Sequence, residues 1–452
     1  MPESKKSSGL VESAEHHRTA SITTLGCRLN QSESLLIKDR LIKNGYTILP
    51  DGETADLCIL NTCTVTDRAD SKCRAAIRGH IRKNPKSVIV VAGCYSQMGY
   101  KQVAEIPGVD LIIGNQQKLE LSKYVDGKKN ERPLIVRDKI DKTDFSIDFV
   151  GDTPYPKRAN LKIQDGCDFF CSFCIIPHAR GRARCRDWDN MLSEARSLAD
   201  RGVKEIILTG VNIGTYTYEG RGIVEVVDAL SAIEGIQRIR ISSIEPTTIP
   251  TELFDRMNDK SHALLPFLHI PLQSASDRIL KEMYRKYSVQ EYFDFLQLAH
   301  ESVPQAYLGS DIMVGFPGES VEDFDLTCSR FLESPLHFAH VFTYSERKGT
   351  PAKRSTEHID MPERNRRSLH LRRLSEKKKY DFYADHLGRE LDVLFEDPKP
   401  SVWTGLTDDY VRVCVPKESV PHDLTNRLAK IRLNSIAADF VEGEFIELMD
   451  NR

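Results

Sequence analysis

Six strand-helix units in the middle of the chain constrain its fold more than any other feature. Short apolar segments alternate there with helical stretches such as MLSEARSLADRG and SDRILKEMYRKY. The six segments are LKIQDG, EIILTGVN, RIRISSIE, FLHIPLQS, YLGSDIMVGFPG and FAHVFTYS. Repeated βα units are typical of a parallel barrel. We therefore predict a partial (β/α)6 barrel over residues 153–386, with its site at the C-terminal ends of the strands.

The segments on either side of this core predict two further domains and an overall α/β fold class. Residues 21–127 alternate continuous apolar runs with amphipathic ones, a pattern typical of a small doubly wound parallel sheet. Residues 387–452 carry short alternating segments with turn residues between them, which predicts a small antiparallel β-barrel. Residues 1–20 read as a polar tail and residues 128–152 as a linker.

The composition narrows the compartment and the use of the cysteines. No apolar run is long enough to span a bilayer, and the polar first twenty residues lack the apolar stretch of a secretory signal. We therefore expect a cytoplasmic protein with no membrane partner. Eleven cysteines in that compartment are an odd number of reduced thiols rather than a disulfide framework. Metal or redox chemistry becomes their leading use.

Three cysteines stand in a C-x3-C-x2-C loop directly after the first core strand. Cys167, Cys171 and Cys174 supply soft anionic ligands that suit iron in sulfide clusters. Three ligands on a four-iron cube leave one iron open for a substrate or cofactor. The alternatives are a zinc knuckle, with His178 as a fourth ligand, and three packed core cysteines.

A second set of cysteines follows three predicted strands of the N-terminal domain. Cys27 comes after ITTLG, Cys63 after CILNT and Cys94 after VIVVAG. The carboxyl ends of parallel strands share one edge of a sheet, where open α/β sheets build their sites. We expect the three to converge on a second cluster, the alternative being three unrelated buried cysteines. Cys58 lies inside a strand and is expected in the core.

The core motif resembles that of the radical S-adenosylmethionine (SAM) superfamily, with Phe173 as the aromatic residue of C-x3-C-x-aromatic-C. The resemblance implies that SAM chelates the open iron and is split by one electron into methionine and a 5'-deoxyadenosyl radical. It also implies SAM contacts at the later strand ends. The predicted contacts are Phe173, Gly210, Asn212, Ser243, Glu245, Gln273, Ser274 and Asp311.

The three cysteine boxes of the second set resemble those of the methylthiotransferase family. The boxes are TLGCRLNQSES, NTCTVTDRADSKCR and VAGCYSQ. Three further segments extend the match over nearly the whole chain: HIPLQSASDRILKEMYRKY, DIMVGFPGES and YSERKGTPA. The resemblance implies two 4Fe-4S clusters, SAM, an electron donor and a sulfur source, with catalytic roles for all six cysteines. The implied reaction converts C-H to C-S-CH3.

The run TVT after Cys63 resembles the family branch that acts on N6-threonylcarbamoyladenosine at tRNA position 37. The implied partner is a tRNA anticodon stem-loop. One alternative is the branch that modifies an aspartate of a ribosomal protein. The other is a non-catalytic, zinc-stabilised RNA-binding protein.

Charge and aromatic residues offer candidate RNA contacts. Pro362–Tyr380 holds eight Lys and Arg against two Glu, which suits either phosphate binding or a solvated helix face. The C-terminal segment resembles the RNA-binding TRAM domain, yet residues 387–452 hold eight Lys and Arg against thirteen Asp and Glu. Stacking by Trp403 or Tyr410 could compensate, unless these rings are barrel core. A second basic run, expected to share one face beside the catalytic loop, is Arg180, Arg182, Arg184 and Arg186.

Four cysteines receive no role from the sequence: Cys73, Cys185, Cys328 and Cys414. Cys73 and Cys185 lie close in sequence to the two ligand sets. We expect these two to be sensitive to oxidation.

Overall fold

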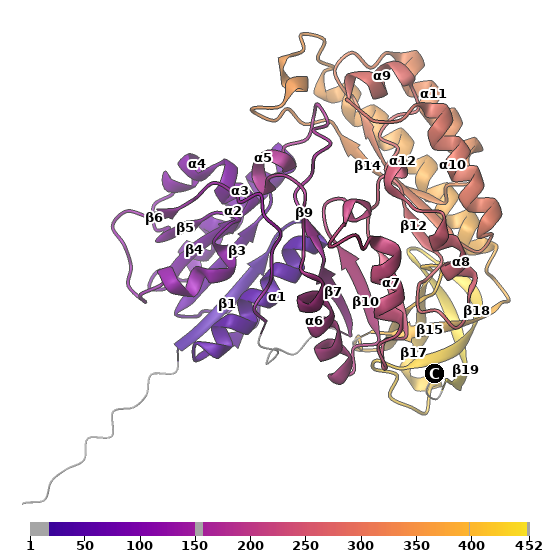
Figure 1. The fold of residues 1–452 in the computed structure, drawn as a ribbon, viewed down its shortest axis with the longest axis horizontal. Helices are drawn as coiled ribbons and strands as arrows, with labels where there is room; N and C mark the ends of the chain where they lie inside the picture. The colour runs from indigo at the N-terminus through magenta and orange to yellow at the C-terminus, as the bar shows by residue number, and fades with distance from the viewer. Residues whose placement is uncertain (1–17, 150–156, 397, 450–452) are drawn as a thin grey trace, which may run out of the picture.

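A computed structural model describes residues 18–149, 157–396 and 398–449. The N-terminal domain lies beside the core barrel, and the C-terminal barrel packs against another side of the core (Figure 1). The predicted tail over residues 1–20 lies outside the described residues as far as residue 17. Its last three residues already belong to the first strand.

The N-terminal domain is a parallel sheet of six strands in the order β2-β1-β3-β4-β5-β6. The two central strands, β3 and β4, are buried at every residue because helices cover both faces of the sheet. The strands are β1 Arg18–Thr24, β2 Tyr46–Leu49, β3 Leu57–Thr62, β4 Val88–Gly93, β5 Leu111–Ile113 and β6 Leu134–Val136.

Helices on the two faces confirm the doubly wound arrangement. Ile59 of β3 packs with Ile37 and Leu41 of α1 on one face, while the next residue, Leu60, packs with Ile77 of α2 on the other. This alternation follows from the two-residue period of a strand. The helices are α1 Arg28–Lys43, α2 Asp67–Lys83, α3 Cys94–Met98, α4 Tyr100–Ala104 and the 3-10 helix η1 Lys118–Tyr124.

Strand β6 lies inside the segment that the sequence predicted to be a linker. Its residues Leu134–Val136 pair in parallel with β5 at the edge of the sheet. The strand has three residues, two of them exposed, so it carries no apolar period that a sequence pattern could detect. The predicted linker over 128–152 therefore contributes the last strand of the N-terminal sheet.

The core confirms the predicted partial barrel. Its six parallel strands form two three-stranded sheets, β7-β10-β11 and β12-β13-β14, joined by bridges between Ile239 and Leu264 and between Ser243 and His269. The strands are β7 Arg158–Lys162, β10 Glu205–Thr209, β11 Arg238–Ile241, β12 Phe267–His269, β13 Tyr307–Val314 and β14 Phe338–Thr343. A short hairpin of β8 Gln164–Asp165 and β9 Arg184–Cys185 flanks the loop after β7.

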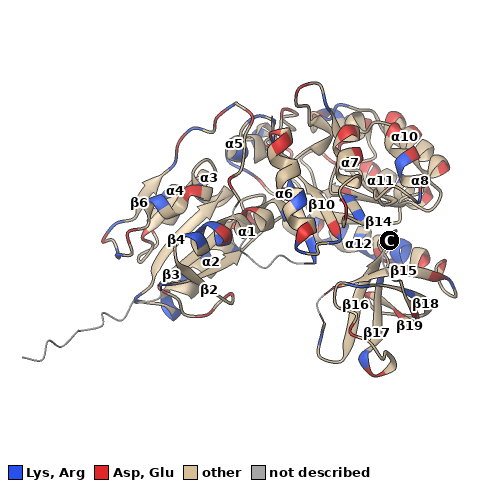
Figure 2. Cartoon of the chain, turned by 60° about the horizontal axis from the view of Figure 1, so that its bottom comes forward, with Lys and Arg blue, Asp and Glu red and all other residues tan. Residues whose placement is uncertain are grey.

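Helices surround the core strands, and basic and acidic residues are interspersed along them (Figure 2). α10 begins at a capping box in which Ser288 and Glu291 satisfy each other's backbone N–H groups. The helices are α5 Ile176–Arg180, α6 Trp188–Asp200, α7 Ile223–Ser231, α8 Glu252–Asn258, α9 Asp277–Glu282, α10 Val289–Ser302, α11 Val321–Glu333 and α12 Met361–Ala384. Single 3-10 turns are η2 Ile213–Thr215, η3 Pro246–Thr248, η4 Pro351–Arg354 and, in the C-terminal domain, η5 Lys417–Ser419.

The C-terminal domain is a closed five-stranded barrel in the order β15-β16-β17-β19-β18. Its pairs are antiparallel, as predicted, except β17 with β19, which is parallel. The strands are β15 Glu390–Phe395, β16 Val402–Thr407, β17 Arg412–Pro416, β18 Leu428–Ala437 and β19 Phe440–Leu448.

This barrel shares a hydrophobic cluster with the core. Phe267 and Tyr307, at the starts of β12 and β13, pack in one cluster with Phe382 of α12 and with barrel residues such as Val413. Arg238 of β11 also donates hydrogen bonds to the carbonyl oxygens of the barrel, at 2.9 Å. The C-terminal barrel thus packs tightly against the core domain rather than being joined to it only by the chain.

Among the described residues, no helix combines the length and the apolar character needed to cross a membrane.

A glycine in the barrel tests the packing of the C-terminal domain. A Cβ added at Gly443 would lie 2.3 Å from Ile431 Cγ2, so we expect Gly443→Ala to lower the free energy of unfolding by about 1–3 kcal/mol. Gly79 in α2 is the matched control, because a Cβ there meets nothing within 4 Å. Gly79→Ala is expected to stabilise by about 0.5–1 kcal/mol. Urea unfolding measures both, and equal shifts would contradict the packing.

Candidate active site

A cavity of about 830 Å³ lies where the three domains meet. The N-terminal domain contributes Cys27 and Arg28 to its wall, and the C-terminal barrel contributes Tyr410. The core contributes residues from the loop after β7 and from the ends of its later strands. This volume falls in the range that holds a cofactor or a small substrate.

The core cysteines all reach this cavity. Cys167, Cys171 and Cys174 line it together with Phe173. Burial raises the pKa of Cys167 to about 11 and that of Cys174 to about 12, and neighbouring thiols of the triad add to both rises. The Nη1 atom of Arg285 lies 3.2 Å from Cys171 Sγ, where its positive charge favours the thiolate. Metal coordination would supply the remaining stabilisation that deprotonated thiols require.

The N-terminal cysteines converge as predicted, and one of them faces the cavity. Burial, together with the nearby thiols of Cys94 and Cys27, raises the pKa of Cys63 to about 12. Cys63 and Cys94 are buried, whereas Cys27 is exposed and lines the cavity. Cys27 also stands at the N-terminus of α1, where the helix dipole favours negative charge on its sulfur. The second set therefore meets the first through Cys27.

Two glycines set the approach of the cysteine loops. Gly26 has φ of +107°, and a Cβ on it would lie 2.6 Å from Cys63 Cβ, so only glycine lets Cys27 come this close to Cys63. Gly166 has φ of +73°, and a Cβ there would lie 2.0 Å from the carbonyl oxygen of Arg182. Both loops thus depend on a glycine immediately before a cysteine.

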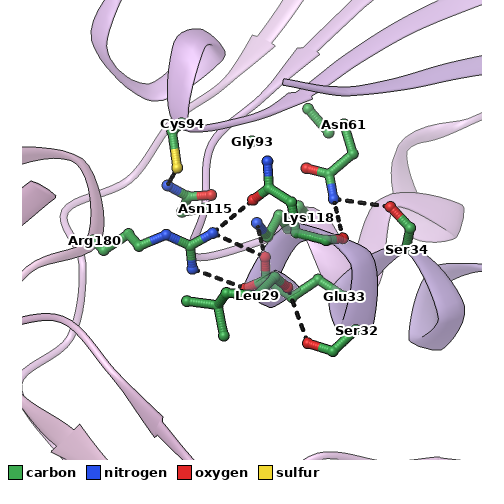
Figure 3. Close-up of polar contacts among 12 residues, drawn as sticks. Leu29, Ser32, Glu33, Ser34, Asn61, Gly93, Cys94, Asn115, Lys118 and Arg180 are labelled. Atoms are coloured by element: carbon green, nitrogen blue, oxygen red, sulfur yellow. Dashed lines mark hydrogen bonds and ion pairs between the residues drawn. The ribbon is translucent and has the colours of Figure 1, made fainter. Parts of the chain in front are cut away.

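A buried ion network joins the N-terminal domain to the core beside Cys94 (Figure 3). Glu33 of α1 accepts from Lys118 of η1, from Lys162 at 2.8 Å and from Arg180 at 3.0 Å. Asp165 accepts from the same Lys162 at 2.6 Å and Arg180 at 3.1 Å.

The network carries excess positive charge. Arg184 lies 3.7 Å from Asp165, so four cations face two carboxylates. The nearby Cys94 contributes to the raised pKa of Arg180, and Asn115 Nδ2 lies 3.5 Å from Cys94 Sγ. Buried cations lower the cost of placing anionic sulfur ligands in this interior.

Seven of the eight predicted SAM contacts line the cavity: Phe173, Gly210, Asn212, Ser243, Glu245, Gln273 and Asp311. Gln273 has φ of +67°, and its backbone pairs with the end of β13. Asp311 pairs with His269 at 3.0 Å, which holds the pKa of the carboxyl below its usual range against the effect of burial. Ser274 is the exception, because it is fully buried and its hydroxyl lies 3.5 Å from Thr327 Oγ1. Ser274 therefore does not line the cavity.

Comparisons with known proteins agree with this geometry. Residues 161–331 match the radical SAM superfamily, and residues 19–114 match the uncharacterized protein family UPF0004. The chain is 35% identical to the threonylcarbamoyladenosine tRNA methylthiotransferase MtaB of Bacillus subtilis, over 96% of this chain and 97% of that protein. The chain belongs to the radical SAM methylthiotransferase family.

Other relatives in the family differ in the nucleoside that their names state. The MtaB protein of Chlamydia pneumoniae is 33% identical over 96% of this chain and 99% of its own length. The tRNA-2-methylthio-N(6)-dimethylallyladenosine synthase of Anaplasma phagocytophilum is 30% identical over 93% of this chain and 97% of its own length. Among solved structures, the radical SAM methyltransferase TsrM of Kitasatospora setae has a TM-score of 0.53 at 14% identity, covering 74% of this chain and 77% of that one. That similarity concerns the fold alone.

The residues present fit the SAM and 4Fe-4S cofactors that this family uses. Each cysteine set has three thiols, and the cavity wall beside the core triad offers the polar strand ends already described. In the part of the chain that the structure describes, no three His, Cys, Asp or Glu side chains are grouped to hold a single metal ion. A four-iron cube differs from one zinc ion because each thiolate binds a separate iron, which spaces the sulfur atoms more widely.

The expectation that four arginines share an exposed face beside the catalytic loop is wrong. Arg180 belongs to the buried network, and Arg186 is fully buried against Glu194. Arg184 is also largely buried, and only Arg182 is exposed, beside Asp168. These arginines are internal because acidic partners from other elements neutralise them, which their spacing along the chain does not reveal.

The basic helix α12 is partly internal too. Arg364 pairs with Glu346 and Arg367 with Glu319, so both face the core. Lys378 donates to three carbonyl oxygens at the end of α11. The positive charge of this helix is therefore only partly available to RNA.

The two candidate stacking residues separate clearly. Trp403 lies in the hydrophobic cluster of the barrel with 7% of its surface exposed, whereas Tyr410 lines the cavity.

The cysteines without an assigned role are buried. Cys58 lies in the core as predicted, and Cys73 donates to the carbonyl oxygen of Cys63 at 3.3 Å. Cys185 is also buried, so neither it nor Cys73 is exposed to oxidants in the folded state.

Sequence reasoning missed several residues of the cavity wall: Arg28, Arg240, His269 and Arg285. Arg285 contacts both Cys171 and Glu245, yet it is distant from both in sequence. No spacing rule connects such positions. Arg28 directly follows Cys27, and His269 and Arg285 lie in the segment HIPLQSASDRILKEMYRKY, but none of the three was singled out.

Glu33 tests the role of the buried network. Glu33→Gln leaves three buried cations without their shared carboxylate, so we expect the free energy of unfolding at pH 7 to fall by about 3–5 kcal/mol. The surrounding cations hold the pKa of Glu33 well below its ordinary value of 4.5, although burial alone would raise it. Ionised Glu33 therefore stabilises the protein above pH 4.5, and this contribution is lost as the pH falls through the lower folded-state pKa.

Chemical unfolding at a series of pH values measures this effect. The difference between wild type and Glu33→Gln should narrow as the pH falls below 4.5. Asp381→Asn, which breaks the exposed pair with Lys377, is the control and should cost no more than about 0.5 kcal/mol. A difference for Glu33→Gln that stays constant down to pH 3 would contradict the role of its charge.

Proposed function

We propose that this enzyme methylthiolates C2 of N6-threonylcarbamoyladenosine at position 37 of tRNA. The observation that supports the proposal is that cysteines of two domains, Cys27 and the triad Cys167, Cys171 and Cys174, open onto one cavity. Two cofactors that act on one carbon atom need this arrangement. The names of the MtaB relatives support the choice of nucleoside.

In this proposal the core triad holds a 4Fe-4S cluster, and Cys27, Cys63 and Cys94 hold a second one. When bound, the core cluster and one SAM would supply the radical that abstracts hydrogen, and the second cluster would supply sulfur that carries a methyl group from another SAM. Glu245 and Arg285 form an ion pair at the triad, and Arg285 keeps a positive charge beside Cys171. Cys171 is buried, and the cavity around the triad would limit the access of water to reactive species when the cofactors are bound.

The strand ends are proposed to position SAM. The Gln164 side chain accepts from the backbone N–H groups of Val211 at 2.8 Å and Asn212 at 3.1 Å, which holds the end of β10 in place. His269 orients the Asp311 carboxylate across the cavity. We propose that Gly210, Asn212, Ser243, Gln273 and Asp311, with Phe173 and Glu245, contact SAM.

The substrate sets the proposed partners and compartment. The partners are a tRNA anticodon stem-loop, an electron donor for the core cluster and a sulfur source for the second. A tRNA substrate places the enzyme in the cytoplasm.

Mass spectrometry of tRNA nucleosides tests the substrate. In a strain lacking this gene we expect 2-methylthio-N6-threonylcarbamoyladenosine to disappear and N6-threonylcarbamoyladenosine to accumulate. The wild-type gene should restore the product, and Cys174→Ala should not, because one iron ligand is then lost. An unchanged nucleoside profile would refute the proposal. Loss of the dimethylallyl product, or of a methylthiolated ribosomal-protein aspartate, would assign the enzyme to another branch.

Iron analysis after anaerobic reconstitution tests the two cysteine sets. We expect about eight irons per wild-type chain and about four in either of two triple-serine variants. One variant replaces Cys27, Cys63 and Cys94, and the other replaces Cys167, Cys171 and Cys174. Cys328→Ala, which changes a buried cysteine outside both sets, is the control and should keep about eight. About four irons in the wild type would contradict the second cluster.

A further inference from the structure

Aromatic rings and arginines form one wall of the cavity, between the core and the C-terminal barrel. The ring centroids of Tyr410 and Phe267 lie 4.7 Å apart, and Tyr307 stacks on Phe267 at 5.8 Å. The guanidinium of Arg240 lies over the Tyr410 ring at 4.8 Å. Arg28 donates from Nη2 to the Tyr410 hydroxyl at 3.0 Å, and so links the N-terminal domain to this wall.

The backbone holds Tyr410 in place at some cost. Tyr410 has φ of +73°, a left-handed conformation that is unfavourable for an aromatic residue by about 1 kcal/mol or more. It sits in the turn from β16 to β17, where Thr407 and Val411 pair through their backbones at 3.0 Å. Strain of this kind is found at ligand-binding positions more often than elsewhere. Here it directs the phenol toward Arg28 and the cavity.

Positive charge is concentrated at this phenol. Burial alone would raise the pKa of Tyr410, yet Arg28, Arg240, Arg158 and Arg412 together lower it.

Most of these arginines already have acidic partners. Glu205 pairs with Arg158 and Arg240, and Glu396 pairs with Arg158 and Arg412. Arg238, behind this wall, pairs with Asp408. Arg28 differs: within the described residues it has no ion-pair partner, and its hydrogen bond goes to a phenol hydroxyl rather than to a carboxylate. A cation on a cavity wall, held but not neutralised, is suited to bind an anion.

We propose that Arg28, oriented by Tyr410, binds the carboxylate of the threonylcarbamoyl group of the substrate nucleoside and so selects it. This inference rests on the proposed function. C2 of adenine and its N6 substituent lie on the same edge of the base, on either side of N1. Arg28 directly follows Cys27, so a base that presents C2 to the second cysteine set brings its N6 substituent toward Arg28. The aromatic wall offers contact to the base itself.

The alternative anion is an RNA phosphate, and the surroundings of Arg28 favour the carboxylate. The wall around it is made of rings that line a cavity, which suits a base turned out of its stack. Backbone phosphates remain at the surface, where basic side chains meet them. The planar guanidinium matches a carboxylate through two parallel hydrogen bonds.

Binding of three synthetic anticodon stem-loop RNAs to the cluster-loaded enzyme tests this role. The RNAs differ only at position 37, which carries threonylcarbamoyladenosine, its carboxyl methyl ester or unmodified adenosine. Fluorescence anisotropy should show that the wild type binds the carboxylate RNA about tenfold or more tightly than the other two. Arg28→Met should lose this preference and keep its affinity for the adenosine RNA. Arg28→Lys should keep part of it, because the charge remains.

Two further variants protect the test. The matched control is Arg256→Met, which changes an arginine of α8 that pairs with Asp228 of α7, and it should bind like the wild type. If Arg28→Met loses iron or melts early, Tyr410→Phe replaces it. That variant removes the hydroxyl that orients Arg28 and should reduce the preference for the carboxylate RNA.

The outcomes are distinct. A preference that survives Arg28→Met, or equal weakening of all three RNAs as expected for a phosphate contact, would overturn the inference. A wild type that methylthiolates the nucleoside but shows no preference would also overturn it. A wild type that neither prefers the carboxylate RNA nor makes the methylthiolated nucleoside in cells would instead overturn the proposed function.

Discussion

The whole site depends on one buried carboxylate, Glu33, and the three cations around it. Lys118 comes from the same domain as Glu33, while Lys162 and Arg180 come from the core. Such charges are tolerated in an interior only when each has partners with good geometry. The network therefore fixes the orientation of the two domains, because another packing of the domains would leave several buried charges without partners. Cys94 lies close to Arg180 of the network, and Cys27 is the N-cap of α1, the helix that carries Glu33. The network therefore also determines where the second cysteine set lies.

Electrostatics links this network to the cofactors that the family uses. The network holds two more cations than carboxylates, and Arg285 places a further guanidinium beside the core triad. Neutral buried thiols do not need this charge, whereas thiolates on a cluster do. The interior is thus arranged for ligands that become anionic when metal binds. The raised pKa values of the Cys63 and Cys174 thiols describe the protein before metal binds.

The sequence predicted the parts of the molecule that local pattern controls. The βα period predicted the core and the N-terminal sheet, and the apolar runs before the two cysteine sets predicted their place beyond strand ends, where we propose that the six cysteines hold the clusters. Glu33 could not be identified in this way. It lies on an amphipathic helix where a glutamate is ordinarily solvated, and its burial arises from residues 85 to 147 positions away. Arg180 and Arg186 were misread for the same reason, since tertiary partners decide whether an arginine is inside. The sequence did not predict strand β6, because three residues are too few to show an apolar period.

The aromatic wall of the cavity, between the core and the C-terminal barrel, forms because the core barrel is incomplete. Six strands do not close, so the starts of β12 and β13 present Phe267 and Tyr307 to a neighbouring domain. The C-terminal barrel covers them and in doing so inserts Tyr410 into the cavity. Its net negative composition is unsuited to general attraction of RNA, yet the arginines that face it from the core and from α1 reverse the sign locally. The domain thus acts through one shaped, positively charged contact rather than through its overall charge.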